Sequence, residues 1–96
     1  MDKWAYILVF DDALGTRQEV QAFLNSRSEI LNWYACLPNA IFFVSDKTAA
    51  TLSEVIKEFK GDKNALFIIL DVKTDRQGWL PKKAWEFISN PKASWE

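Results

Sequence analysis

The chain has 96 residues, which is enough for one domain built around a single hydrophobic core. Hydrophobic residues make up 49% of the sequence and aromatic residues 15%, a composition that excludes an intrinsically disordered chain. Twelve Lys and Arg residues stand against 13 Asp and Glu residues, and the resulting net charge of -1 argues against strong non-specific binding to nucleic acid or to an anionic membrane.

The N-terminal part of the chain predicts a strand followed by a helix. Residues 5–10 (AYILVF) form a β-branched and aromatic run that is long enough for a buried strand and too short for a helix. Loop-forming residues follow, and Thr16 and Glu19 then have the spacing of a capping box, which marks a helix start. The apolar stripe of this helix consists of Val20, Phe23 and Leu24.

The middle of the chain predicts a hairpin, a second helix and a last strand. Segments 30–38 and 40–44 have strand composition, and the short Pro-Asn turn between them predicts an antiparallel hairpin. Asp46 is expected to cap the second helix, and Gly61 is expected to end it. Residues 65–72 (ALFIILDV) form the most strand-like segment of the protein. The apolar face of the second helix consists of Leu52, Val55, Ile56 and Phe59.

This order of elements predicts the α+β class and a ferredoxin-like βαββαβ split fold. We expect one domain over residues 1–96, with a core at about 4–72, four antiparallel strands and both helices on one face. The first and third strands would be central and the other two would lie at the edges. An apolar edge strand at 65–72 would favour aggregation unless another segment covers it or pairs with it. The pattern therefore predicts a dimer or a covering segment.

Segment 77–89 is the candidate for that cover. A proline at the expected first helical position is followed by Trp85 and Ile88, which share a helical face. The segment either packs over the sheet or a dimer seam, or it is a detachable helix that binds a partner protein. The tail at 90–96 is predicted to be frayed. The candidate interface residues are Phe67, Ile69, Trp79, Trp85 and Ile88.

Several absences narrow the functions that the sequence can support. Histidine is absent, which excludes Ser-His-Asp and Cys-His catalysis and histidine-rich metal sites within this sequence. The single cysteine, Cys36, has no partner for an intrachain disulfide and is interpreted as a small buried hydrophobe. The first apolar run is too short for a membrane helix, and no small-residue cleavage site follows it. We therefore expect a cytoplasmic protein that does not act at a membrane.

Two acidic residues and four lysines are the candidates for binding chemistry. Asp11 and Asp12 end the first strand, where carboxylates can hold Mg²⁺, although such a pair is also common in ordinary turns. The weak candidates for nucleic-acid contact are interleaved with acidic residues, which favours a solvated surface; they are Lys57, Lys60, Lys82 and Lys83. Trp33 and Tyr34 are adjacent and should point to opposite faces of their strand, so that one of them lies on the outer face of the sheet.

The order of elements, the strand ending in Phe10-Asp11 and the sequence Gly78-Trp79-Leu80 together resemble the SinR-like family of small bacterial proteins. That family is distantly similar to the small ferredoxin-like subunit of the CRISPR spacer-integration complex. The resemblance implies a homodimer, and it implies that Asp11 could bind metal in a nuclease site. The chain departs from the pattern at Phe10, where a tyrosine is usual, and no arginine-rich surface follows the first strand.

Three functional hypotheses follow from these features. The leading one is a non-enzymatic, cytoplasmic binding or assembly module that forms a homodimer and needs no cofactor. The first alternative is a Mg²⁺-dependent nuclease or nucleic-acid-binding protein, with Asp11 as the catalytic residue and Asp11 and Asp12 as the metal ligands. The second alternative is a small-molecule sensor domain, in which a ligand would bind at a dimer interface. The sequence names no ligand, substrate or pathway.

Overall fold

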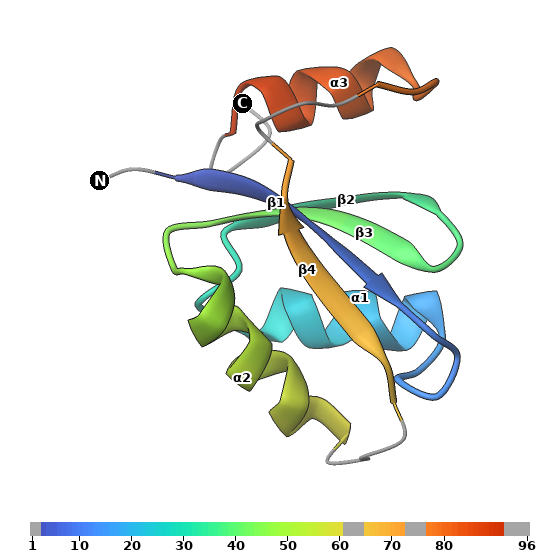
Figure 1. Cartoon of the computed structure of the whole chain (residues 1–96), viewed down its shortest axis with the longest axis vertical. Helices are drawn as coiled ribbons and strands as arrows, with labels where there is room; N and C mark the ends of the chain where they lie inside the picture. The colour runs from blue at the N-terminus through green and yellow to red at the C-terminus, as the bar shows by residue number, and fades with distance from the viewer. Residues whose placement is uncertain (1–2, 61–64, 73–76, 92–96) are drawn as a thin grey trace.

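A twisted antiparallel sheet separates two layers of helix (Figure 1). The computed structural model describes residues 3–60, 65–72 and 77–91. These residues confirm the α+β class that the sequence predicts. In chain order the elements are β1 (Trp4–Phe10), α1 (Arg17–Ser26), β2 (Asn32–Leu37), β3 (Ala40–Ser45), α2 (Ala49–Lys60), β4 (Phe67–Asp71) and α3 (Lys82–Ser89).

The strands are arranged in the order β2-β3-β1-β4, and each neighbouring pair is antiparallel. The first and third strands are therefore central and the second and fourth lie at the edges, as expected. Leu8 shows the register at the middle of the sheet, because it lies opposite Ile41 on β3 and opposite Ile69 on β4. This order leaves β4 with β1 as its only strand neighbour among the described residues.

Helices α1 and α2 cover one face of the sheet and enclose the larger core. The predicted capping box at the start of α1 is confirmed, because the Glu19 amide donates to Thr16 Oγ1 at 3.1 Å and the Thr16 amide donates to Glu19 Oε1 at 2.8 Å. Below the sheet, this core includes Leu8, Val20, Leu24, Ile41, Phe43, Leu52 and Ile56. Their burial supplies the main hydrophobic stabilisation on this face.

The start of α2 corrects one sequence-based expectation. Asp46 does not cap this helix; its carboxylate lies 3.6 Å from the Lys47 ammonium. Thr48 takes the capping position instead, since its Oγ1 accepts a hydrogen bond from the Thr51 amide at 3.3 Å. The helix therefore begins one residue after a threonine rather than directly after the aspartate.

Helix α3 covers the opposite face of the sheet, on the far side from α1 and α2 (Figure 1). Ala84, Phe87 and Ile88 are buried against a second apolar cluster that β1 and β3 provide. Pro81 is the N-cap residue rather than the first helical residue. Helix α3 of segment 77–89 thus packs over the sheet, mainly against β1 and β2.

Some expectations fall on positions that the structure does not describe. These are the predicted end of α2 at Gly61, the side chain of Lys60 and residues 92–96 of the tail. Along the stretches 3–60, 65–72 and 77–91, every helix is too short and too polar to cross a lipid bilayer.

Candidate docking edge at strand β4

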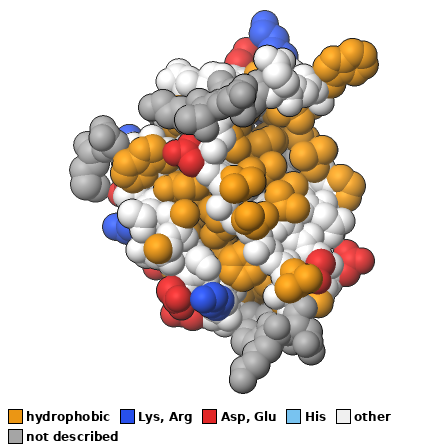
Figure 2. Space-filling view, viewed as in Figure 1, with side chains coloured by type: hydrophobic (Ala, Val, Ile, Leu, Met, Phe, Trp, Pro, Cys, Tyr) orange, Lys and Arg blue, Asp and Glu red, His pale blue; other side chains and the backbone are white. Residues whose placement is uncertain are grey.

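Strand β4 exposes a patch of large apolar side chains. Leu66, Ile68 and Leu70 are 68%, 52% and 49% exposed, and Val9 lies beside Ile68 in the register of β1 and β4. We call these four residues the outer apolar patch. Figure 2 shows hydrophobic side chains gathered across the middle of the face that carries β4. Helix α3 packs on the same face of the sheet, mainly against β1 and β2, and the four side chains of the patch remain 39–68% exposed beside it.

The backbone of β4 is also open along its outer side. The Asp11 amide donates to the Leu66 carbonyl at 3.0 Å, and the Val72 amide donates to the Ala5 carbonyl at 3.1 Å. Alternate residues of an antiparallel strand direct their N–H and C=O groups to the same neighbour. The backbone groups of Phe67 and Ile69 therefore point away from β1. No described strand lies beyond them.

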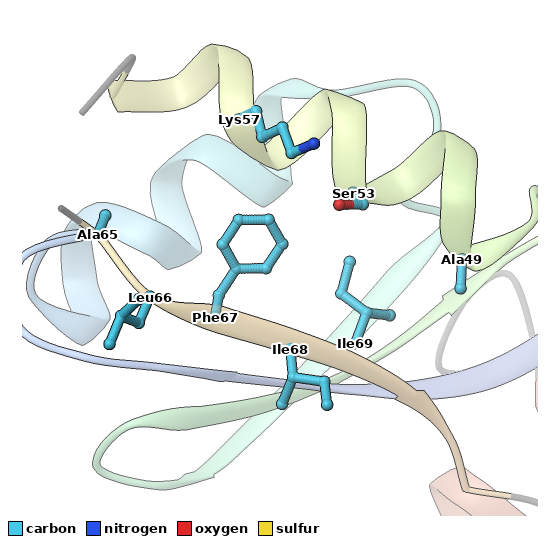
Figure 3. A pocket seen from close by; sticks show the side chains of 8 residues that line it. All are labelled: Ala49, Ser53, Lys57, Ala65, Leu66, Phe67, Ile68 and Ile69. Atoms are coloured by element: carbon cyan, nitrogen blue, oxygen red, sulfur yellow. The ribbon is translucent and has the colours of Figure 1, made fainter. Parts of the chain in front are cut away.

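A groove of about 380 Å³ runs between β4 and α2 (Figure 3). Phe67 and Ile69 point from β4 toward α2, whereas Ile68 points to the other side of the strand. Lys57 is the charged residue among the described side chains of the lining, and its Nζ lies 3.3 Å from Glu54 Oε1. An extended segment added beside β4 could therefore direct alternate side chains into this groove, as in β-strand addition.

Asp11 and Asp12 stabilise the turn after β1. Asp11 Oδ1 accepts a hydrogen bond from the Leu66 amide at 3.2 Å, and Asp12 Oδ1 accepts one from Asn39 Nδ2 at 3.0 Å. The two backbone carbonyls accept from the amides of Leu14 and Gly15. Asp11 thus holds the start of β4 beside β1. Within the described residues, no cluster of three or more acidic or cysteine side chains could hold a metal ion.

The predicted interface residues fall into different environments. Phe67 and Ile69 line the groove, and Trp79 is fully exposed in the loop before α3. Trp85 is half-buried against the sheet, while Ile88 is 4% exposed and belongs to the core under α3. The structure therefore brings only Phe67 and Ile69 together at the open edge.

The candidate lysines do not gather on one surface. Lys57 lies on α2, whereas Lys82 and Lys83 lie on α3 at the opposite face of the sheet. Lys83 Nζ is 5.9 Å from the centre of the Tyr34 ring. Trp33 and Tyr34 lie on opposite faces as predicted, since Trp33 packs with the core under α1 and α2 and Tyr34 packs with the core under α3. Helix α3 thus covers the aromatic ring expected on an open sheet face.

Sequence reasoning missed the outer apolar patch. It selected Phe67 and Ile69, whose side chains turn toward α2, and it passed over the exposed neighbours on the other side of the same strand. The uninterrupted apolar run was the signal for this patch in the sequence. Side chains alternate between the two faces of a strand, so such a run places apolar side chains on both faces. Which of the two faces stays uncovered depends on where α3 packs, and a residue pattern confined to β4 carries no information about that.

Comparisons with protein-family models, curated proteins and solved structures return no match to this chain.

Proposed function

We propose that this protein is a non-enzymatic binding and assembly module that forms a homodimer through the edge of β4. The observation that carries this proposal is the open edge itself, where Phe67 and Ile69 direct backbone groups outward beside an exposed apolar patch. Edge strands of this kind pair readily with another chain unless charge, proline or a covering element protects them. Residues 65–70 contain no charge and no proline.

We further infer that the architecture is the ferredoxin-like split βαβ arrangement. The order β2-β3-β1-β4, with α1 and α2 on one face, supports this inference. The same arrangement explains why the most strand-like segment is at an edge, since a fold of this topology has no inner position for its last strand. We also propose a cytoplasmic location, which the free thiol of Cys36 supports.

The nuclease alternative has weaker support because its candidate metal ligands make hydrogen bonds within the fold. Asp11 accepts from the Leu66 amide, and Asp12 accepts from Asn39. Both carboxylates therefore contribute to the turn that joins β1, β4 and the β2–β3 hairpin. The basic residues expected to hold nucleic acid also lie on opposite faces of the sheet. We therefore keep the binding module as the function that the geometry supports best.

Size-exclusion chromatography with light scattering tests the proposal, with absorbance recorded at two wavelengths over a series of protein concentrations. We expect a mass near twice 11.1 kDa at high concentration, without excess nucleic-acid absorbance. Ile68→Lys should shift the protein to the monomer, because it places a charge on the edge that must become buried. Ala22→Lys adds the same charge on the exposed side of α1 and should leave the dimer intact.

Three outcomes would overturn this proposal. The first is a wild-type protein that stays monomeric at every concentration, and the second is an Ile68→Lys variant that remains dimeric. The third is a dimer that carries bound nucleic acid, which would favour the nucleic-acid-binding alternative instead. Circular dichroism of each variant shows whether the monomer is still folded, so that loss of the dimer is not confused with unfolding.

A further inference from the structure

We propose that the second copy pairs with β4 in one antiparallel register, with the two-fold axis passing beside Ile68. This inference rests on the proposed homodimer and deepens it by specifying which residues face one another. The occupant of the open edge is then a second copy of this chain. A symmetric dimer requires the same patch on both subunits to be complementary to itself, so the sequence of β4 can be tested against each available register.

The geometry of the edge leaves four registers to compare. In a two-fold antiparallel pair, the axis passes beside one residue, and the residues on either side of it then pair in reverse order. The outward backbone groups of Phe67 and Ile69 can enter a ladder when the axis lies beside Phe67, Ile68, Ile69 or Leu70. The choice among these centres therefore depends on which side chains become neighbours.

The register centred on Ile68 places apolar side chains opposite apolar side chains along the shared ladder. Ile68 faces its own copy, and Leu66 faces Leu70 of the second copy, so the exposed residues of β4 in the outer apolar patch cover one another. On the other face, Phe67 lies opposite Ile69 of the second copy. These two residues exchange both backbone N–H···O bonds, because their N–H and C=O groups already point outward.

The register centred on Phe67 places Leu70 opposite the polar Asn64, so it covers less of the outer apolar patch than the register centred on Ile68. The registers centred on Ile69 and Leu70 bring a charge into the interface. With the axis beside Ile69, Asp71 lies opposite Phe67 of the second copy, and with the axis beside Leu70 it lies opposite Ile69. Either pairing desolvates a carboxylate against an apolar side chain, which is costly. With the axis beside Ile68, Asp71 instead faces Ala65 at the end of the ladder, where the side chain of Asp71 is exposed in the free subunit.

The groove beside α2 fits the same register. A two-fold axis perpendicular to the sheet keeps both copies of α2 on one face, so the two grooves meet above the paired strands. Phe67 and Ile69 already line the groove and point toward α2 (Figure 3). The pairing brings the same two residues of the second copy beside them. Lys57 does not oppose this approach, because its Nζ pairs with Glu54 within the subunit.

Disulfide trapping distinguishes the registers. The background variant is Cys36→Ala, which removes the single native thiol. Ile68→Cys and Leu70→Cys are then prepared separately, and Leu66→Cys is mixed with an affinity-tagged Leu70→Cys. All three sites are exposed, so their thiols differ little in access. Facing residues of a non-hydrogen-bonded pair have Cα atoms about 4.5 Å apart, which is within the range of a disulfide.

We expect Ile68→Cys alone to give covalent dimer on mild oxidation, and the mixture of Leu66→Cys and tagged Leu70→Cys to give the mixed dimer. Leu70→Cys alone is the matched control for random collision and should give about tenfold less covalent dimer, because its two copies are too far apart for a disulfide. Trapping of Leu70→Cys alone would overturn the register. So would trapping of Ile68→Cys mixed with Leu70→Cys, or of Ile68→Cys mixed with Leu66→Cys, when Ile68→Cys alone gives no covalent dimer. A dimer seen by light scattering with such a pattern would leave the proposed function standing, whereas a monomer would overturn both.

Discussion

Strands β3 and β4 have nearly the same kind of sequence and opposite surroundings. Both are runs of large apolar residues, AIFFV in β3 and LFIIL in and just before β4. Every residue of β3 is buried, from Ala40 to Ser45, whereas β4 alternates between half-buried and exposed positions. The difference does not come from composition. It comes from how many neighbours the rest of the chain provides for each strand.

Strand β3 has a neighbour on every side. β1 and β2 lie beside it, the core under α1 and α2 includes Phe43, and the core under α3 includes Phe42 and Val44. Strand β4 has β1 on one side and α2 over one face. Helix α3 has eight residues and is therefore about 12 Å long, which is too short to cover four strands that lie about 4.8 Å apart. A short covering helix thus buries one apolar strand and leaves the other partly exposed.

The largest expected effect is on the buried strand. Phe43→Ala should lower the free energy of unfolding by about 3–5 kcal/mol, because the ring is fully buried between the sheet and the helices. Ile68→Ala, on the exposed side of β4, should change it by no more than about 0.5 kcal/mol in a dilute monomeric sample. Urea unfolding followed by circular dichroism measures both. Equal losses in the two variants would contradict the difference between the strands.

The sequence carried enough information for the elements because each had a local signal. The capping box at Thr16 and Glu19 predicted the start of α1, and the apolar runs predicted all four strands. The cap of α2 was wrong, since Asp46 and Thr48 are both good caps and only the backbone path decides between them. Local chemistry thus predicts that a helix begins near these residues but does not select the residue.

The candidate site was less predictable because it depends on packing between distant segments. The sequence indicated that the strand at 65–72 would be an unprotected edge, and the structure places β4 at the edge. It left open whether Ile88 would pack against the sheet of its own chain or at a dimer seam, and it did not indicate that Ile68 would remain exposed. Both outcomes follow from where α3 docks, which is a contact between residues far apart in the sequence.

A smaller effect should appear at the end of β3, where a polar group is buried. Ser45 is fully buried; its Oγ donates to the Glu29 carbonyl at 2.7 Å and accepts from the Lys47 amide at 3.0 Å. Ser45→Ala removes both bonds and should lower the free energy of unfolding by about 1–3 kcal/mol. Ser26 donates an equally short bond to the Phe23 carbonyl at an exposed position, so Ser26→Ala is the matched control.

The comparison of these two serines separates the effect of burial on the free energy of unfolding from the effect of losing a hydrogen bond. Thermal unfolding of both variants should show a clear loss for Ser45→Ala and almost none for Ser26→Ala, since water replaces the lost partner at an exposed site. Similar losses in both would mean that burial at the end of β3 does not add to the cost. β3 would then be less distinct from β4 than the exposures indicate.

The smallest effect concerns Tyr6, which connects the two strands because it lies opposite Phe43 on β3 and opposite Asp71 on β4. Its hydroxyl donates to the Lys47 carbonyl at 2.8 Å, so Tyr6→Phe should cost about 0.5–1.5 kcal/mol at neutral pH. Burial, and to a lesser extent the charge of Asp71, raises the pKa of Tyr6 above its usual value of 10.0.

Because the folded state keeps this proton to a higher pH than the unfolded state, the stability contributed by Tyr6 is complete below about pH 10 and is lost as the pH rises toward the folded pKa. Wild type should therefore lose its advantage in free energy of unfolding over Tyr6→Phe above about pH 10, as measured by urea unfolding. Other groups that titrate in this range affect both proteins alike. Asp71→Asn removes the β4 contribution to this shift and should leave more of this advantage at the same pH. If the difference in free energy of unfolding stays constant with pH, ionisation of Tyr6 costs the folded protein no more than the unfolded protein. The difference between the buried strand β3 and the exposed strand β4 would then be visible only in side-chain packing and not in the ionisation of Tyr6.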